Sequence, residues 1–264
     1  MKKNIIKSII SILLIIILIF LIKNTYSQAK WKKQSRKMVQ EYIEKNINST
    51  FSINKITFFT SCDAKNKTGS KSNYTIENLY AYTDIAIFID NNQVKSAEEN
   101  TLKSLKISNI KFIKNPDLGE PNLYFKSIND FAKSEIKEEN KIGDELNFTI
   151  SSQNNVDLTK PILYNNCANP ITLSYINQNI RTDYTMLDTE NPITYNGKLL
   201  ERCNVELEKI KASISFDIDI ENNKGQKFKT TISTDIPYEN NNKSIYDGNL
   251  RVDKDIKNVF IRYE

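Results

Sequence analysis

A period-two alternation of apolar and polar residues is the feature that most constrains the fold of this chain. Alternate residues over 212–220 are apolar, with Ser and Asp between them. The alternation returns over 228–236, where alternate residues are apolar or Thr. The intervening residues 222–225 have the turn-forming sequence Asn-Asn-Lys-Gly. Two alternating runs around such a turn predict a β-hairpin with one buried face and one solvent-facing face.

Three further segments depart from simple alternation. Residues 79–89 are largely apolar on both faces, which predicts a strand that is central in its sheet or covered by another element. Over residues 105–112 the apolar positions change phase at Ser108-Asn109, which predicts a β-bulge. Ser127 followed by Asp130 is typical of a helix cap, so residues 127–136 are predicted to form a short helix.

The order of these elements predicts a mainly β fold. Strands spaced by about 8–12 residues, with turn signals between them, are typical of antiparallel β-sandwiches of immunoglobulin-like architecture. The polar stretch 151–160 is the expected linker, so the prediction is one or two such domains, over 51–155 and 156–264. One elaborated β domain over 51–264 is the alternative. The Cys–Trp–Cys signature of true immunoglobulin domains is missing, because the sole Trp is Trp31.

The N-terminal region lacks the alternation of the body and contains a continuous apolar run. An uncharged run rich in Ile and Leu covers residues 8–22 and extends to residue 5 across Lys7. About 20 apolar residues span the hydrocarbon core of a bilayer. Residues 5–22 are therefore predicted to be a transmembrane signal anchor behind a short tail, residues 1–4. The alternative is a cleaved signal peptide, with its cleavage site in the sequence Ser-Gln-Ala at 27–29.

Residues 23–50 are predicted to form a basic juxtamembrane helix or stalk, helical over 30–47, where apolar residues recur four positions apart. Its basic residues and its tryptophan are expected at the membrane interface, either in a lipid-surface helix or in a stalk that packs on the following domain. These residues are Lys23, Lys30, Trp31, Lys32, Lys33, Arg36 and Lys37. The very short, signal-like N-terminal tail favours an extracytoplasmic body, although the six basic residues after the apolar run favour a cytoplasmic one.

The net charge divides the chain in the same way. The formal charge is +5, but residues 1–45 hold ten Lys or Arg and two Glu, a local net charge of +8. The remaining 219 residues therefore have a net charge of −3, which speaks against a nucleic-acid-binding domain with a basic face. Ile, Asn and Lys are abundant, and because their codons are A/T-rich they indicate a bacterial genome rich in A and T.

The chain contains no histidine. Ser-His-Asp sites, Cys-His sites and imidazole metal ligands are therefore excluded. The sequence also contains neither a G-x-G-x-x-G nor a Walker-type lysine motif, and no cofactor is expected. Asp217, Asp219 and Glu221 share one face of a predicted strand and form a weak calcium candidate. The solvated face of an amphipathic strand is the plainer interpretation of these three carboxylates.

Three cysteines, Cys62, Cys167 and Cys203, leave at least one thiol unpaired. The expectation is buried free thiols, and if one disulfide forms, Cys167–Cys203 is the expected pair. Tyr74, Tyr80 and Tyr82 lie close together in the sequence and are expected to pack across strands rather than to bind glycan or protein by stacking and hydrogen bonding.

Together these features favour a single-pass protein of the cell membrane with an extracytoplasmic β body and no catalytic role. Its expected partners are the lipid bilayer and an unidentified protein or envelope polymer. Two alternatives stay open. One is a secreted hydrolase of envelope material that works through carboxylates alone after signal-peptide cleavage. The other is a scaffold on the cytoplasmic side of the membrane.

Overall fold

The computed structural model describes residues 21–39, 50–69, 73–91, 101–187 and 193–263. The chain divides into two compact units, Met1–Asn48 and Ser49–Glu264. Strands make up 54% of the structure, and the sheets are antiparallel in all pairings but one. The mainly β, antiparallel character predicted from the alternation is confirmed.

In the first unit, residues 21–39 form a helix whose side chains are exposed. The predicted stalk helix is thus helical over its described part, residues 30–39. Most of the predicted anchor, residues 5–20, lies outside the described residues. In the described part of the chain, no helix combines the length and the apolar character needed to cross a membrane.

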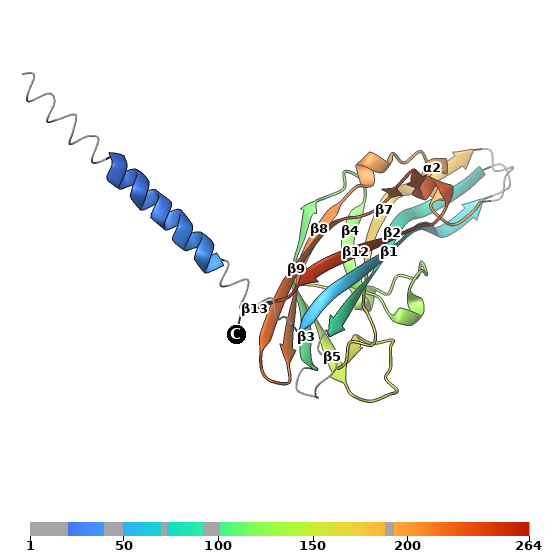
Figure 1. Cartoon of the computed structure of the whole chain (residues 1–264). Helices are drawn as coiled ribbons and strands as arrows, with labels where there is room; N and C mark the ends of the chain where they lie inside the picture. Colours follow the sequence, from blue (N-terminus) through green and yellow to red (C-terminus); the bar gives the residue numbers. More distant parts are fainter. Residues whose placement is uncertain (1–20, 40–49, 70–72, 92–100, 188–192, 264) are drawn as a thin grey trace, which may run out of the picture. The chain divides into compact units, whose positions relative to one another are not determined.

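The second unit contains a five-stranded sheet and a six-stranded sheet (Figure 1). The five-stranded sheet has the order β12 (Leu250–Val259), β1 (Phe51–Gly69), β2 (Asn73–Asn91), β7 (Ile171–Leu187), β4 (Glu120–Phe125). The six-stranded sheet has the order β13 (Ile261–Arg262), β9 (Lys227–Asp235), β8 (Ser213–Asn222), β3 (Leu102–Lys114), β5 (Leu146–Ser151), β6 (Ile162–Tyr164). Only β5 and β6 pair in parallel.

Short elements connect the strands. They are the hairpin β10 (Glu239–Asn240) and β11 (Lys243–Ser244), the α-helix α2 (Lys198–Arg202), and the 3₁₀ helices η2 (Ile128–Asp130), η3 (Glu138–Asn140), η4 (Leu207–Ile210) and η5 (Ile245–Asp247).

The two sheets pack face to face across one continuous apolar core. Aromatic rings meet edge to face between them: Phe51 of β1 lies 5.7 Å from Phe228 of β9, centroid to centroid, and Phe125 of β4 lies 6.3 Å from Phe148 of β5. Both sheets combine strands from either side of residue 155, since β1 pairs with β12 and β3 pairs with β8. The expected linker 151–160 connects β5 to its neighbour β6 in one sheet.

Three local predictions are confirmed. β8 and β9 form the predicted hairpin, in which Phe216 pairs with Ile232. The register of β3 shifts between Ser108 and Lys111, where Asn109 has a φ of 52°, as expected of a bulge. The doubly apolar segment 79–89 lies in β2, the central strand of the five-stranded sheet.

The predicted helix at 127–136 is wrong. Only the single 3₁₀ turn η2 forms there. The Ser127 hydroxyl donates to the Asp130 carboxylate at 2.8 Å instead of capping the backbone. Ala132 then adopts a φ of 64°, which ends helical propagation. The segment 126–142 instead lies as a strap over the outer face of the five-stranded sheet, where Ile136 contacts the cluster of Tyr80, Tyr82 and Tyr124.

Candidate functional site

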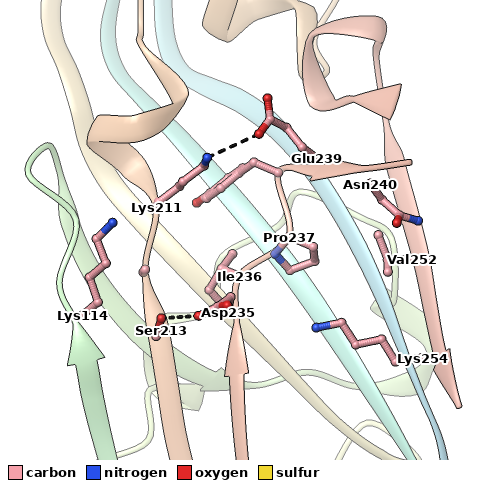
Figure 2. Close-up of a pocket in the computed structure, with 12 residues that line it drawn as sticks. Lys114, Lys211, Ser213, Asp235, Ile236, Pro237, Glu239, Asn240, Val252 and Lys254 are labelled. Atoms are coloured by element: carbon pink, nitrogen blue, oxygen red, sulfur yellow. Dashed lines mark hydrogen bonds and ion pairs between the residues drawn. The ribbon is translucent and has the colours of Figure 1, made fainter. Parts of the chain in front are cut away.

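A pocket of about 420 Å³ opens where β3, β8, β9 and β12 approach the β10–β11 hairpin (Figure 2). Four separate segments of the chain line it. The lining residues are Lys114, Lys211, Ala212, Ser213, Asp235, Ile236, Pro237, Tyr238, Glu239, Asn240, Val252 and Lys254. The pocket lies within the size range of small-molecule sites, about 300–1,000 Å³.

Apolar side chains line the inner part of the pocket. Ala212, Ile236, Tyr238 and Val252 are all buried. The strand geometry explains their position, because the Ile236 amide donates to the Ala212 carbonyl at 2.9 Å and so extends the β8–β9 pairing by one step. Pro237 has no amide hydrogen to continue the ladder, so the chain turns away there and leaves a hollow.

The acidic groups of the pocket already have partners inside the protein. The Asp235 carboxylate accepts a hydrogen bond from the Ser213 hydroxyl. Glu239 pairs with Lys211 at 3.3 Å, and Lys211 also pairs with Glu208 just outside the pocket. The hydrogen bond to Glu208 raises the pKa of Lys211 and lowers that of Glu208. Lys211 and Glu239 thus form an ion pair, whereas Asp235 has a hydroxyl partner and keeps its negative charge in the pocket.

Two other lysines of the pocket form no salt bridge in the described part of the chain, although the charge of Lys114, after the hydrogen bond from Lys211, helps to lower the pKa of Glu208. Lys254 reaches in from β12, with its Nζ 3.3 Å from the Thr234 hydroxyl and 5.1 Å from the centre of the Phe58 ring. Lys114 stands at the end of β3, on the opposite side of the pocket (Figure 2). Neither ammonium group forms a salt bridge with a carboxylate of the described residues. The pocket lining therefore contains the lysines Lys114, Lys211 and Lys254 and the acids Asp235 and Glu239, and of these only Lys211 and Glu239 pair with each other in the described residues.

A second polar cluster lies buried beneath the strap. Asp84 of β2 accepts hydrogen bonds from the Ser174 hydroxyl at 2.5 Å and from the Ala132 amide at 2.8 Å. The Lys126 ammonium lies 3.7 Å from the same carboxylate and donates to the Lys133 carbonyl at 2.6 Å. Burial raises the pKa of Asp84 to about 6, although Lys126 opposes the shift. Burial likewise lowers the pKa of Lys126.

This buried cluster fastens the strap to the sheet. Its hydrogen bonds join Asp84 of β2 to Ser174 of β7 and to the Ala132 amide of the strap, and join Lys126 to the Lys133 carbonyl within the strap. The Lys126 ammonium also lies over the Tyr82 ring, 5.6 Å from its centre, and the Tyr80 hydroxyl donates to the Ser134 carbonyl at 2.9 Å. Both tyrosines pack in the protein, as the sequence favoured. The cluster is covered by the strap and therefore holds structure in place.

The three calcium candidates lie on one face of β8, and each is engaged with a lysine. Lys229 contacts Asp217 at 3.4 Å and Asp219 at 3.2 Å. Lys103 contacts Glu221 at 2.6 Å. Ammonium groups thus stand beside these carboxylates, and in the described residues no group of three or more Cys, Asp or Glu is placed to hold a metal ion.

The cysteines are free thiols, and Cys167 and Cys203 are not joined. Cys203 caps α2 and is buried, with its sulfur 3.8 Å from the Met186 sulfur. The pKa of Cys62 is raised, mainly by burial and to a smaller extent by the nearby Cys203. Cys167 lies apart, in the connection from β6 to β7, and burial raises its pKa to about 12. At neutral pH all three are therefore protonated, unreactive thiols.

The expected membrane-interface residues, from Lys23 to Lys37, lie on the helix over 21–39 and are exposed. The pocket itself was not predicted from the sequence, because its lining comes from four segments up to 140 residues apart, Lys114 to Lys254. The one local signal was Pro237, which directly follows the alternating run of β9.

Comparison of the chain with protein-family models, with curated proteins and with solved structures gave no match. A functional proposal therefore rests on the geometry of the described residues.

Proposed function

We propose that this protein is a non-enzymatic binding module of the cell envelope, held at the membrane by its N-terminal segment, with the β body on the extracytoplasmic side. In this proposal the body binds an envelope polymer or protein through the pocket lined by β3, β8, β9 and β12.

The pocket is the observation that carries the proposal. It combines a buried apolar floor, which includes Ile236 and Val252, with a rim of polar and charged groups. This combination is typical of ligand sites, in which apolar contact supplies affinity and a few polar groups fix the orientation. Two of the rim groups, Lys114 and Lys254, are available to a ligand because no carboxylate of the described residues pairs with them.

The chemistry of the pocket supports binding rather than hydrolysis. A carboxylate-dependent hydrolase needs one carboxyl group with a raised pKa to act as an acid. The pocket carboxylates already have partners in the protein: Asp235 accepts a hydrogen bond from the Ser213 hydroxyl, and Glu239 pairs with Lys211. Among the described residues, the carboxyl group with a clearly raised pKa is that of Asp84, which lies under the strap.

The membrane part of the proposal rests on the sequence. The apolar run over residues 5–22 has nearly the length of a membrane span, and basic residues flank it on both sides. A body held in this way would meet envelope material at high local concentration, so a pocket of modest affinity would suffice.

The proposal is tested by co-sedimentation of the full-length protein, in detergent micelles, with insoluble envelope material from the cells that produce it. We expect the protein to sediment with the envelope and to release no soluble fragments. Asn240→Trp, which adds a bulky ring to the pocket rim, should reduce the bound fraction. Asn154→Trp, the same change in the exposed connection between β5 and β6, is the matched control.

Equal binding by the two tryptophan variants would contradict the pocket as the binding site. Release of soluble fragments would replace the binding module with a hydrolase. The side of the membrane is tested separately, by protease treatment of intact cells that carry a C-terminal epitope tag. We expect a membrane-bound tag that the protease destroys, whereas a protected tag would place the body in the cytoplasm.

A further inference from the structure

We propose that the pocket binds an anionic sugar unit, a carbohydrate ring that carries a carboxylate or phosphate group, and that Lys114 and Lys254 hold its acidic group. This inference rests on the proposed function and names the ligand class for the same pocket.

The first argument is charge. Lys114, Lys211 and Lys254 line the pocket together with Asp235 and Glu239. Glu239 is paired with Lys211, and Asp235 accepts from the Ser213 hydroxyl. Lys114 and Lys254 line opposite sides of the pocket, with Ser213 and Asp235 between them, and neither lysine forms a salt bridge with a carboxylate of the described residues (Figure 2). An anion placed between them would gain two favourable charge interactions in a partly desolvated site.

The position of Lys254 is the second argument. Its ammonium lies above the ring of the buried Phe58 and next to the Thr234 hydroxyl. These contacts restrict a side chain that is otherwise flexible, so less conformational entropy is lost when a ligand binds. The carboxylates of Asp253 and Asp255, its neighbours in sequence, lie on the other face of the strand, because successive side chains of β12 alternate.

The remaining lining fits a sugar ring. The pocket floor offers apolar surface from Pro237 and Val252, against which the C–H face of a ring can pack. Around this floor stand Asn240, Asp235 and Glu239, whose side-chain oxygen atoms accept hydrogen bonds from hydroxyl groups. Acceptors for hydroxyls beside unpaired ammonium groups match a ligand that carries both hydroxyls and an acid. A free metal cation is disfavoured by the same two lysines.

The test uses the full-length protein in detergent micelles and three probes: D-glucuronate, D-glucose 6-phosphate and neutral D-glucose. Titration calorimetry or saturation-transfer NMR would measure their binding. We expect the two anions to bind with a Kd of about 1 mM or tighter and glucose to bind much more weakly. Stronger binding by the phosphate or by the carboxylate would identify which acid the pocket prefers.

Three charge-removing variants complete the test. Lys114→Gln and Lys254→Gln should each weaken anion binding roughly tenfold or more, because each removes a hydrogen bond between charged groups. Lys160→Gln, in the connection from β5 to β6, removes the same charge outside the pocket and should leave binding unchanged. Raised salt should weaken the binding of both anions.

Several results would overturn this inference. Equal binding of glucose and glucuronate would remove the role of the acidic group, and so would equal Kd values for Lys254→Gln and Lys160→Gln. Both results would leave the proposed function intact, because sedimentation with the envelope and the comparison of Asn240→Trp with Asn154→Trp test the pocket independently of the charge of the ligand. Absence of binding by all three probes would overturn the sugar proposal alone, while sedimentation with the envelope tests the binding module independently.

Discussion

The outer faces of the two sheets differ in how they meet solvent: one is covered by a segment of the chain, and the other is polar. The strap 126–142 covers the outer face of the five-stranded sheet, whereas the outer face of β8 and β9 in the six-stranded sheet is lined with charged and polar side chains. Each face contains an Asp–Lys pair. The Asp84–Lys126 pair under the strap is 3.7 Å long with side chains 0% and 6% exposed, and the Asp219–Lys229 pair is 3.2 Å long with side chains 15% and 44% exposed.

The comparison shows that burial, rather than the distance between the charged groups, decides the direction in which the pKa of the aspartate shifts. Beneath the strap, burial raises the pKa of Asp84 even though Lys126 is close. On the open face, Lys229 also contacts Asp217. Burial alone would raise the pKa of Asp217, but hydrogen bonds from Thr231 and Asn109 and the charge of Lys229 outweigh it, so the pKa is lowered. The longer, buried pair therefore has the larger energetic consequences.

The largest expected effect comes from emptying the space under the strap. Tyr82→Ala removes a ring that is 5% exposed and packs against Phe59. We expect the free energy of unfolding to fall by about 3–5 kcal/mol, as for other large core truncations. Tyr263→Ala, which removes a ring 48% exposed near Lys229, should cost less than about 1 kcal/mol. Urea unfolding of both variants measures the difference. Equal losses of unfolding free energy would contradict the contrast between the covered face and the open face.

Removal of one lysine from each pair sharpens the contrast. Lys126→Met leaves the Asp84 carboxylate buried beside a neutral side chain and should cost about 3–5 kcal/mol at neutral pH. Lys229→Met on the open face should cost about 1 kcal/mol or less. The double variant Asp84→Asn with Lys126→Met should be more stable than Lys126→Met alone, because it leaves no unpaired buried charge. A double variant less stable than the single one would contradict a purely electrostatic role.

The sequence predicted the open face better than the covered one. The alternation in β8 and β9 directly reports one wet face and one buried face, and the hairpin and its turn follow from it. The apolar residues on both faces of β2 predicted a strand that is central or covered by another element, but they did not show which segment covers it. The helix predicted over 127–136 does not form, because Ser127 and Asp130, which resemble a helix cap in the sequence, hydrogen-bond to each other through their side chains. The immunoglobulin-like architecture stays a prediction.

The covered pair also predicts a pH dependence. The folded-state pKa of Asp84 is about 6, above its ordinary value of 3.8, because the carboxyl group is buried, so its contribution to stability is complete below pH 3.8 and is lost as the pH rises through 6. Relative to Asp84→Asn, the wild-type protein should lose roughly 3 kcal/mol of unfolding free energy between pH 4 and pH 7. Denaturant unfolding across this range measures the difference between the two proteins. A difference independent of pH would show that Asp84 titrates normally.

The smallest expected effect belongs to the open face. Asp219→Asn weakens an ion pair with Lys229 that water and salt screen, so we expect a loss of about 0.5 kcal/mol at low salt. The loss should shrink further at 1 M salt, where the Debye length is about 3 Å. Thermal unfolding at two salt concentrations measures it. A loss as large as that of Lys126→Met would erase the distinction between the two faces.

The pocket lies beyond what local sequence patterns can show. Lys114 and Lys254 are brought to one site by strand pairings between distant segments, β3 with β8 and β1 with β12. The charged residues that the sequence did single out, Asp217, Asp219 and Glu221, lie on the open face and are engaged with lysines. In a lysine-rich chain, only the arrangement in space distinguishes a paired lysine from an available one.

The central claim, that the protein binds envelope material through its pocket, is tested most directly by lysine footprinting. The full-length protein is labelled with an amine-reactive ester, with and without envelope material, and the labelled positions are quantified by mass spectrometry. We predict protection of Lys114 and Lys254 and unchanged labelling of Lys103 and Lys160, which lie outside the pocket. Protection of Lys103 or Lys160 without protection of the two pocket lysines would contradict the claim.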